Sequence, residues 1–247
     1  MKFLLSLALV LLLFSCKNEP REITAQEIID RTIEVAGGDR YKKAIIKFHF
    51  RQHTYTSRRK LGEFRLERIT RDTLNIIKDV LDNTGFRRSI KDSLVQVHDS
   101  MVVRYSSSMN SVHYFAHLPF GLNDKAVNKE LDGETMILGQ AYYKLRITFQ
   151  QEGGGVDHHD EFMYWIHKEK YTIDYLAYKF LVNDGGIRFR VAYNPRVIEG
   201  IRFVDYKNYT TEDFTTDLRK LDDLYLKGEL EMLSTIITEV IDVEVRD

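Results

Sequence analysis

The sequence predicts an α+β fold, a long antiparallel up-and-down meander accompanied by a few helices. Three observations indicate this class. Most of the chain alternates apolar and polar residues with period two, which is typical of strands with one buried and one solvated face. Clusters of glycine, asparagine, aspartate and proline separate these segments, so hairpin follows hairpin. A few other segments repeat apolar residues at helical spacing instead.

The first predicted element is a helix that begins after Thr24. Thr24 and Glu27 fit the capping-box pattern, in which each side chain satisfies an unpaired backbone N–H at the helix start. One stripe at helical spacing follows, formed by Ala25, Ile28, Ile29, Thr32, Ile33 and Ala36. Gly37 and Gly38 end the predicted helix.

The strands are predicted from apolar side chains at every second position, which we assign to the buried face. They cover residues 46–50, 64–66, 143–149, 162–166, 187–193 and 201–203. Turn residues lie at 83–85, 132–133, 153–155, 183–186, 194–195 and 199–200. The predicted strands therefore form a meander.

Two further helices and a last strand complete the prediction. One helix covers residues 100–117 and ends before Pro119, although three consecutive serines weaken its helical propensity. Its apolar side carries Met101, Tyr105, Met109, Val112 and Ala116. The other helix covers residues 217–227, and a strand at 237–245 follows it. No linker rich in proline or glycine divides the chain into two domains.

The N-terminus has the features of a secretory signal. Lys2 precedes an apolar run at 3–14, which is shorter than the roughly 20 residues needed to span a bilayer. The only cysteine, Cys16, follows at the cleavage point, where bacterial lipoprotein processing requires a thiol that takes a diacylglycerol. We therefore expect a lipoprotein signal peptide at 1–15 and a lipidated tether at 16–23. A free cysteine after an ordinary signal peptide is the alternative.

Four stretches of sequence carry a resemblance to known proteins. They are residues 28–38, 160–165 (DEFMYW), 173–178 (IDYLAY) and 187–206. On these residues the chain resembles an uncharacterised lipoprotein family of Bacteroidota, a domain of unknown function. The strand order and the early helix also resemble the LolA/LolB-like lipoprotein carrier superfamily. LolA itself is not lipidated, so a tethered chain is more similar to LolB.

This resemblance implies that residues 24–247 form a single half-barrel domain, a curved and incomplete barrel that wraps around helices. It also implies an apolar interior that holds acyl chains. The location implied is the Gram-negative envelope. There a lipid anchor would hold the protein at the outer membrane, on its periplasmic or its surface face.

Composition excludes several functions. The sequence has 36 Lys and Arg against 37 Asp and Glu, a formal net charge of −1, which argues against nucleic acid as a partner. Cys16 is the only cysteine, so the mature domain has no internal disulfide, thiol nucleophile or cysteine metal site. Residues 153–155 are three glycines without the lysine of a phosphate loop, and no Gly-x-Ser-x-Gly elbow occurs. We therefore expect no cofactor.

Two histidine-containing groups are candidates for metal binding. His158, His159 and Asp160 form a local cluster, but neighbouring strand residues point to opposite faces, so a site needs a bent loop. A polar hairpin tip is the alternative. His113 and His117 lie one helical turn apart, yet the glutamate of a zinc protease helix is missing. Packing beside Tyr114 and Phe115, with ring nitrogens hydrogen-bonded to backbone or water, is the alternative for this pair.

The aromatic residues carry the functional prediction. Fourteen Phe and 14 Tyr occur, many of them on the apolar strand faces. Ordinary core packing explains them if the helices fill the concave sheet, but a wider sheet leaves an apolar cavity. We expect such a cavity to be lined by Phe48, Phe50, Phe64, Leu145, Ile147, Phe162, Tyr164 and Phe189.

The function expected is non-enzymatic binding of an apolar or amphipathic ligand, a lipid or an acyl chain, at the membrane. One alternative is an envelope hydrolase or metal-dependent enzyme that uses His158, His159 and Asp160. The other is a structural or interaction module with a filled core.

Overall fold

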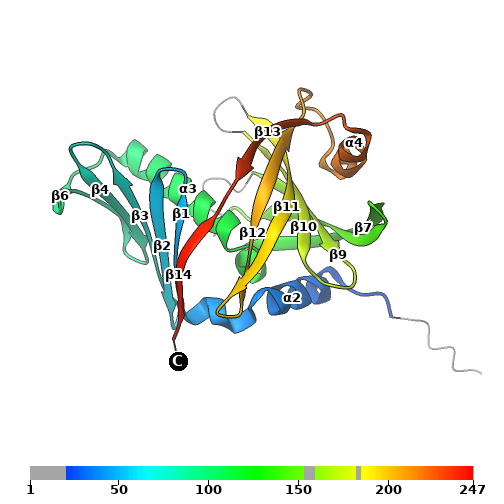
Figure 1. The fold of residues 1–247 in the computed structure, drawn as a ribbon, viewed down its shortest axis with the longest axis horizontal. Coiled ribbons are helices and arrows are strands. Elements are labelled where there is room, and N and C mark those ends of the chain that lie inside the picture. The colour runs from blue at the N-terminus through cyan, green and yellow to red at the C-terminus, as the bar shows by residue number, and fades with distance from the viewer. Residues whose placement is uncertain (1–20, 153–158, 182–184, 247) are drawn as a thin grey trace, which may run out of the picture.

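The computed structural model describes residues 21–152, 159–181 and 185–246. Its strands form two antiparallel sheets of seven strands each, and helices lie against both (Figure 1). The predicted α+β class and antiparallel meander are therefore confirmed. Neither sheet closes into a barrel within the described residues, since β6 and β7 remain as edges.

Sheet A contains the N-terminal strands and the last strand of the chain. Its order is β14-β1-β2-β3-β4-β5-β6. The bounds are β1 (Ala44–Phe50), β2 (His53–Lys60), β3 (Glu63–Arg71), β4 (Ile76–Asp82), β5 (Gly85–Ile90), β6 (Ser93–Val95) and β14 (Glu239–Val245). Of these strands, β1, part of β3 and β14 were predicted from the sequence. Strands β2 and β4–β6 were not predicted, because their sequences lack a clean apolar alternation.

Sheet B contains the middle of the chain. Its order is β13-β12-β11-β10-β9-β8-β7. The bounds are β7 (Val127–Ile137), β8 (Gln140–Phe149), β9 (Glu161–His167), β10 (Ile173–Phe180), β11 (Gly186–Ile198), β12 (Ile201–Thr210) and β13 (Glu231–Ile236). The strands predicted at 143–149, 162–166, 187–193 and 201–203 lie in β8, β9, β11 and β12.

The two sheets are joined where β13 passes into β14. Thr238 lies between these strands, and its backbone N–H donates to Oδ1 of Asp205 at 3.0 Å. Arg196 donates to the same carboxylate oxygen at 3.1 Å and also to the carbonyl of Thr238. Asp205 is 2% exposed. This carboxylate therefore fixes the bend at which the chain leaves sheet B and enters sheet A.

Helix α2 (Ala25–Ala36) confirms the first predicted helix and its capping box. The Glu27 N–H donates to Thr24 Oγ1 at 3.2 Å, and the Thr24 N–H donates to Glu27 Oε2 at 2.9 Å. Ile28 and Ile29 are fully buried, and α2 packs against β7 and β12 of sheet B. Gly37 ends the helix at φ 136°, and the short 3₁₀ helix η2 (Gly38–Lys43) leads into β1.

Helix α3 (Asp99–Ala116) confirms the helix predicted at 100–117 and crosses both sheets (Figure 1). Near its start, Tyr105 stacks on Phe86 of sheet A with ring centroids 6.0 Å apart. Near its end, Phe115 lies 5.1 Å from Tyr178 of sheet B. The short 3₁₀ helix η3 (Phe120–Asn123) follows it. One helix thus spans the space between the two sheets.

The C-terminal helix covers the opposite face of sheet B. The segment predicted at 217–227 consists of the 3₁₀ helix η4 (Leu218–Lys220) and α4 (Leu221–Lys227). Asp222 of α4 is 1% exposed and pairs with Lys144 of β8 at 3.3 Å. Tyr225 packs on Phe189 of β11 at 5.3 Å between ring centroids. Sheet B is therefore covered on both faces, by α2 and α3 on one side and by α4 on the other.

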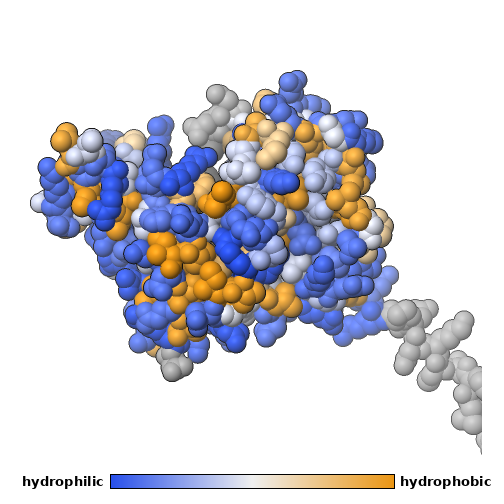
Figure 2. Space-filling model, viewed as in Figure 1, coloured by the Kyte–Doolittle hydropathy of each residue, from blue (hydrophilic) through white to orange (hydrophobic). Residues whose placement is uncertain are grey.

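The surface viewed in Figure 2 is mostly hydrophilic, with an apolar area over the lower part of β12 and β14. Ile241 of β14 is one of the exposed large apolar side chains, at 44% exposure. No helix within the described ranges is long and apolar enough to cross a bilayer.

Candidate ligand-binding cavity

A cavity of about 330 Å³ opens where α3 passes between the two sheets. Its walls come from α3, from β1 of sheet A and from β10–β13 of sheet B. This volume is at the lower end of the ~300–1,000 Å³ range of small-molecule sites. The fold thus leaves a space of ligand size beside its central helix.

One side of the cavity is apolar. The residues concerned are Phe48 and Phe50 on β1, Val112, Phe115 and Ala116 on α3, and Ile236 on β13. Phe48 and Phe50 share a strand face because they are two positions apart, and Val112 and Ala116 share a helix face because they are four apart. Ala116 and Val112 are also small, which leaves the space between helix and sheet unfilled.

A row of polar side chains crosses the wall that sheet B forms, which also carries Ile236. In the antiparallel ladders, Arg190 of β11 pairs with Asn208 of β12, and Asn208 pairs with Ser234 of β13. Residues directly opposite on neighbouring strands project from the same face, and all three line the cavity. Tyr206 pairs with Ile236 in the adjacent row. The cavity therefore has a polar strip next to an apolar one.

Arg190 is the most unusual residue of this row, because it is a charged side chain with only 8% exposure. Its guanidinium carbon lies 3.9 Å from the centroid of the Phe115 ring and 5.0 Å from that of Tyr178. Nη2 donates to the Tyr178 hydroxyl at 2.7 Å. Nε is buried without a hydrogen-bond partner, as is Oδ1 of Asn208. Burial raises the pKa of the neighbouring Tyr206, more than the charge of Arg190 lowers it.

Two further arginines line the cavity, and no acidic residue of the described chain does. Arg51 is exposed, whereas Arg188 is partly buried and donates to the Ile187 carbonyl at 2.9 Å and to Thr210 Oγ1 at 3.1 Å. Because guanidinium groups stay protonated near neutral pH, the lining carries a positive charge.

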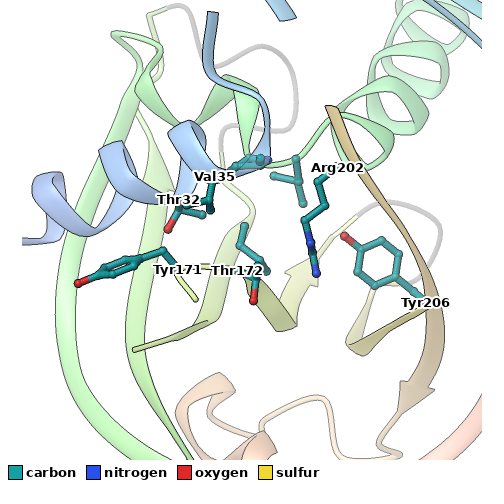
Figure 3. A pocket seen from close by; sticks show the side chains of 10 residues that line it. Thr32, Val35, Tyr171, Thr172, Arg202 and Tyr206 are labelled. Atoms are coloured by element: carbon teal, nitrogen blue, oxygen red, sulfur yellow. The ribbon is translucent and has the colours of Figure 1, made fainter. Parts of the chain in front are cut away.

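A second, much smaller opening lies between α2 and β12 (Figure 3). Thr32 and Val35 of α2 face Tyr171, Arg202 and Tyr206 across it. Its volume of about 10 Å³ is close to the ~10–15 Å³ needed for a single water. This opening is therefore too small for an organic ligand.

The structure divides the eight predicted lining residues among four places. Phe48 and Phe50 line the cavity, and Phe64 lies partly buried on β3. Four others belong to the tightly packed core beneath α2 and α3, namely Leu145, Ile147, Phe162 and Tyr164. Phe189 lies on the other face of sheet B, 5.3 Å from the ring of Trp165, in the cluster beneath α4.

Arg188 and Arg190 were not predicted as lining residues, because the apolar face of β11 was expected to face the interior and packs beneath α4 instead. In the segment Ile187-Arg188-Phe189-Arg190, Ile187 and Phe189 pack with the cluster beneath α4. The two arginines therefore face the cavity. The available signal was the helix predicted at 217–227, since its leucines need an apolar sheet face of their own.

His113 and His117 are buried on α3 at 1% and 3% exposure. Their rings contact Phe48, Tyr55 and Tyr41, so packing beside Tyr114 and Phe115 is not their main environment. His117 Nε2 lies 3.3 Å from Ser57 Oγ, and the other three ring nitrogens make no hydrogen bond within the described structure. The hydrogen bond to Ser57 thus involves a side chain, whereas the prediction named the backbone or water as partners.

The candidate metal cluster lies partly outside the described residues. His158 is among the residues that the structure does not describe, whereas His159 and Asp160 are described and each makes an interaction. In the part of the chain that is described, no group of three or more His, Cys, Asp or Glu could hold a metal ion.

The fold is similar to solved structures at low sequence identity. A LolA superfamily protein from Nitrosomonas europaea matches 92% of this chain and 95% of its own, at 10% identity and a TM-score of 0.52. A DUF1329 family protein from Desulfovibrio piger matches 91% of this chain and 94% of its own, at 8% identity and a TM-score of 0.39. The first of these similarities identifies the fold as LolA-like.

A third structure is a domain provisionally called an outer membrane lipoprotein-sorting protein, from Vibrio parahaemolyticus. It covers 82% of this chain and 98% of its own, at 9% identity and a TM-score of 0.44. Among curated proteins, none matches the sequence. A family model matches residues 2–239, nearly the whole chain. The chain therefore belongs to the family of unknown function DUF6503.

Proposed function

We propose that this protein binds an amphipathic molecule, a lipid or an acyl chain, and acts by binding rather than by catalysis. The observation that carries the proposal is the cavity of about 330 Å³ between α3 and the two sheets, with an apolar side and a polar row. Each methylene moved from water into such a space contributes about 0.8 kcal/mol. An alkyl chain against Phe48, Phe50 and Val112 is thus a sufficient source of affinity.

The LolA-like fold supports this proposal through its geometry. The interior of a strongly curved sheet is either filled by side chains or wide enough to hold one small ligand. Here the core beneath α2 is solid, with Leu145 and Ile147 fully buried, whereas the region beside Val112 and Ala116 is hollow. The binding site proposed is therefore one end of the interior.

The location proposed is the Gram-negative envelope, at the outer membrane, with a bacterium of the Bacteroidota as the proposed source. Residues 1–15 are the proposed signal peptide, Cys16 the lipidated residue, 16–23 the tether and 24–247 the half-barrel domain. The sequence pattern supports this assignment, and Cys16 itself lies outside the described residues. A short tether keeps the cavity near the bilayer from which a lipid ligand would come.

The test is binding of N-phenylnaphthylamine, a neutral apolar fluorophore, to the purified protein. Val112→Trp fills the cavity and is expected to abolish the fluorescence increase. Val103→Trp is the matched control, because Val103 lies on the same helix, is 48% exposed and does not line the cavity. Circular dichroism confirms that both variants fold.

Native mass spectrometry of protein purified from its own membrane, followed by lipid extraction, tests for a natural ligand. A co-purifying lipid that Val112→Trp removes is the expected result. If the fluorophore fails to bind and no lipid co-purifies, the binding function is wrong and a structural or interaction module remains.

A further inference from the structure

We propose that the cavity selects an anionic head group, and that Arg190 is the residue that binds it. This inference rests on the ligand-binding function proposed above. The ligand class is an amphiphile with a carboxylate or phosphate head and an alkyl tail. The head lies on the polar row of Arg190, Asn208 and Ser234, and the tail lies against the apolar side.

Arg190 carries a buried charge without a counter-charge. Arg190 is only 8% exposed, and the side chain that it hydrogen-bonds within the described residues is the neutral hydroxyl of Tyr178, not a carboxylate. Buried charges in proteins are normally paired, because desolvating an isolated ion is costly. The aromatic rings of Phe115 and Tyr178 offset part of that cost. An anion in the cavity would supply the missing partner.

Arg190 also has hydrogen-bond donors that the protein does not use. A guanidinium has five N–H donors in a planar fork, and the Tyr178 hydroxyl takes one of them. Nε is buried without a partner in the described structure, beside a cavity that Arg190 lines. Carboxylate and phosphate oxygens match this fork in shape and charge. A neutral or cationic head group does not.

The neighbours of Arg190 in the polar row can also bind an anion. Asn208 lies directly opposite Arg190, and its Oδ1 is also buried and unpartnered. Its Nδ2 donates to Ser234 Oγ at a long 3.4 Å. Turning the amide lets the Ser234 hydroxyl donate to Oδ1 and presents Nδ2 to the anion. In this arrangement Ser234 satisfies Oδ1 of Asn208, while Arg190 and Nδ2 of Asn208 both donate to the one ligand.

The charge around the site acts in the same direction. Arg51 and Arg188 also line the cavity, and none of its described lining residues is acidic. Their field attracts an anion and disfavours an ammonium head group. Selection by charge is therefore built from three arginines, with Arg190 making the buried contact.

The experiment measures displacement of N-phenylnaphthylamine by four ligands that share one alkyl tail: dodecanoate, dodecyl phosphate, dodecanol and dodecylammonium. The wild-type protein is expected to bind at least one anion roughly 10- to 100-fold more tightly than dodecanol, as hydrogen bonds to charged groups predict. Dodecylammonium is expected to bind most weakly. The order of dodecanoate and dodecyl phosphate distinguishes a fatty acid from a phosphate head.

Arg190→Met is expected to remove the preference for anions while the affinities for dodecanol and the fluorophore change by less than about twofold. Arg190→Lys keeps the charge but loses the planar fork, so it should restore part of the preference. Arg146→Met is the control: it removes one positive charge from β8, where Arg146 pairs with Glu130 and Glu161 and does not line the cavity.

The possible results distinguish a failure of head-group selection from a failure of the proposed ligand binding. If the fluorophore binds but wild-type protein does not distinguish dodecanoate or dodecyl phosphate from dodecanol, the inference is overturned and the binding function stands. Retention of the anion preference in Arg190→Met has the same meaning. If neither the fluorophore nor any amphiphile binds, both proposals fail. Should Arg190→Met not fold, the wild-type series and Arg190→Lys still decide.

Discussion

The guanidinium carbon of Arg190 lies 3.9 Å from the centroid of the Phe115 ring. This contact joins β11 of sheet B to α3 and sets the buried charge at the wall of the cavity. Such cation–π pairs contribute from about 0.5 to about 2 kcal/mol, with the larger values where the pair is desolvated. The position of α3 and the polarity of the cavity are therefore linked through these two residues.

The first prediction concerns this contact. Phe115→Leu is expected to lower the free energy of unfolding by about 1–2 kcal/mol, because Arg190 loses its stacking partner. Phe214→Leu is the control, since Phe214 is 52% exposed, and it should change stability by less than about 0.5 kcal/mol. Urea denaturation measures both. Equal effects of the two substitutions would show that the contact contributes nothing.

The second prediction is a loss of stability on mild acidification. Burial, together with the nearby charges of Arg59 and Arg68, lowers the pKa of His113 to about 3, more than the backbone carbonyl of Glu67 raises it. Burial and the neighbouring His113 also hold the pKa of His117 well below its ordinary 6.5. The unfolded chain therefore binds protons that the folded protein does not, once the pH falls below about 6.5.

The contribution of these two histidines to the free energy of unfolding is therefore complete above pH 6.5. It declines as the pH falls toward 3. Each histidine is expected to remove about 1.4 kcal/mol between pH 7.5 and pH 5.5. His113→Leu should halve that loss, as measured by urea denaturation at both values. The same pH dependence in the variant and the wild type would contradict the prediction. Ser57, Tyr41 and Tyr55 are the other polar groups that face the pair.

The third prediction concerns the end of α2. Gly37 has φ 136°, and a Cβ there would lie 3.1 Å from the Gly200 carbonyl oxygen and 3.2 Å from the Ile201 Cα. Gly133 also has a positive φ, 108°, but open space around it. Gly37→Ala should destabilise the protein by at least about 1 kcal/mol more than Gly133→Ala, because both are strained and only one clashes. Equal melting temperatures of the two variants would contradict the close packing of α2 on the β11–β12 turn.

The fourth prediction concerns the junction of the sheets. Asp205→Asn leaves Arg196 without its carboxylate and is expected to cost roughly 2–3 kcal/mol, below the upper range for buried pairs because Arg196 is a quarter exposed. Glu130→Gln breaks the exposed pair with Arg146 and should cost less than about 0.5 kcal/mol. Chemical denaturation compares them. A small effect at Asp205 would mean that the bend at Thr238 does not depend on this carboxylate.

The fifth prediction concerns the anchor. Cys16→Ser is expected to abolish metabolic labelling with palmitate and to release the protein from the membrane fraction, because serine cannot take the diacylglycerol. Lys17→Ala is the control and should remain labelled. Labelling that persists in Cys16→Ser would exclude the lipoprotein assignment.

Part of the fold was predictable because its signals are local. The capping box of Thr24 and Glu27 and the period-two pattern of β8 and β9 depend only on neighbours in sequence. Strands β2 and β4–β6 were not predicted because polar side chains occupy several of their buried positions, such as Ser57 and Asp79. There, buried Asp79 accepts hydrogen bonds from Arg68 at 2.7 Å and from Arg88 at 2.6 Å, so ion pairs replace the apolar contacts that the pattern requires.

The sequence by itself determined the class of the fold, the two long helices, the meander and the candidate anchor at Cys16. Only the tertiary structure decided which face of β11 looks inward. A period-two pattern indicates that the two faces of a strand differ. When both faces are covered, it does not indicate which element packs on which face. Ile187 and Phe189 pack in one cluster with Leu221 and Tyr225 of α4. Arg190 therefore lies on the other face of β11, where its guanidinium contacts the Phe115 ring and lines the cavity.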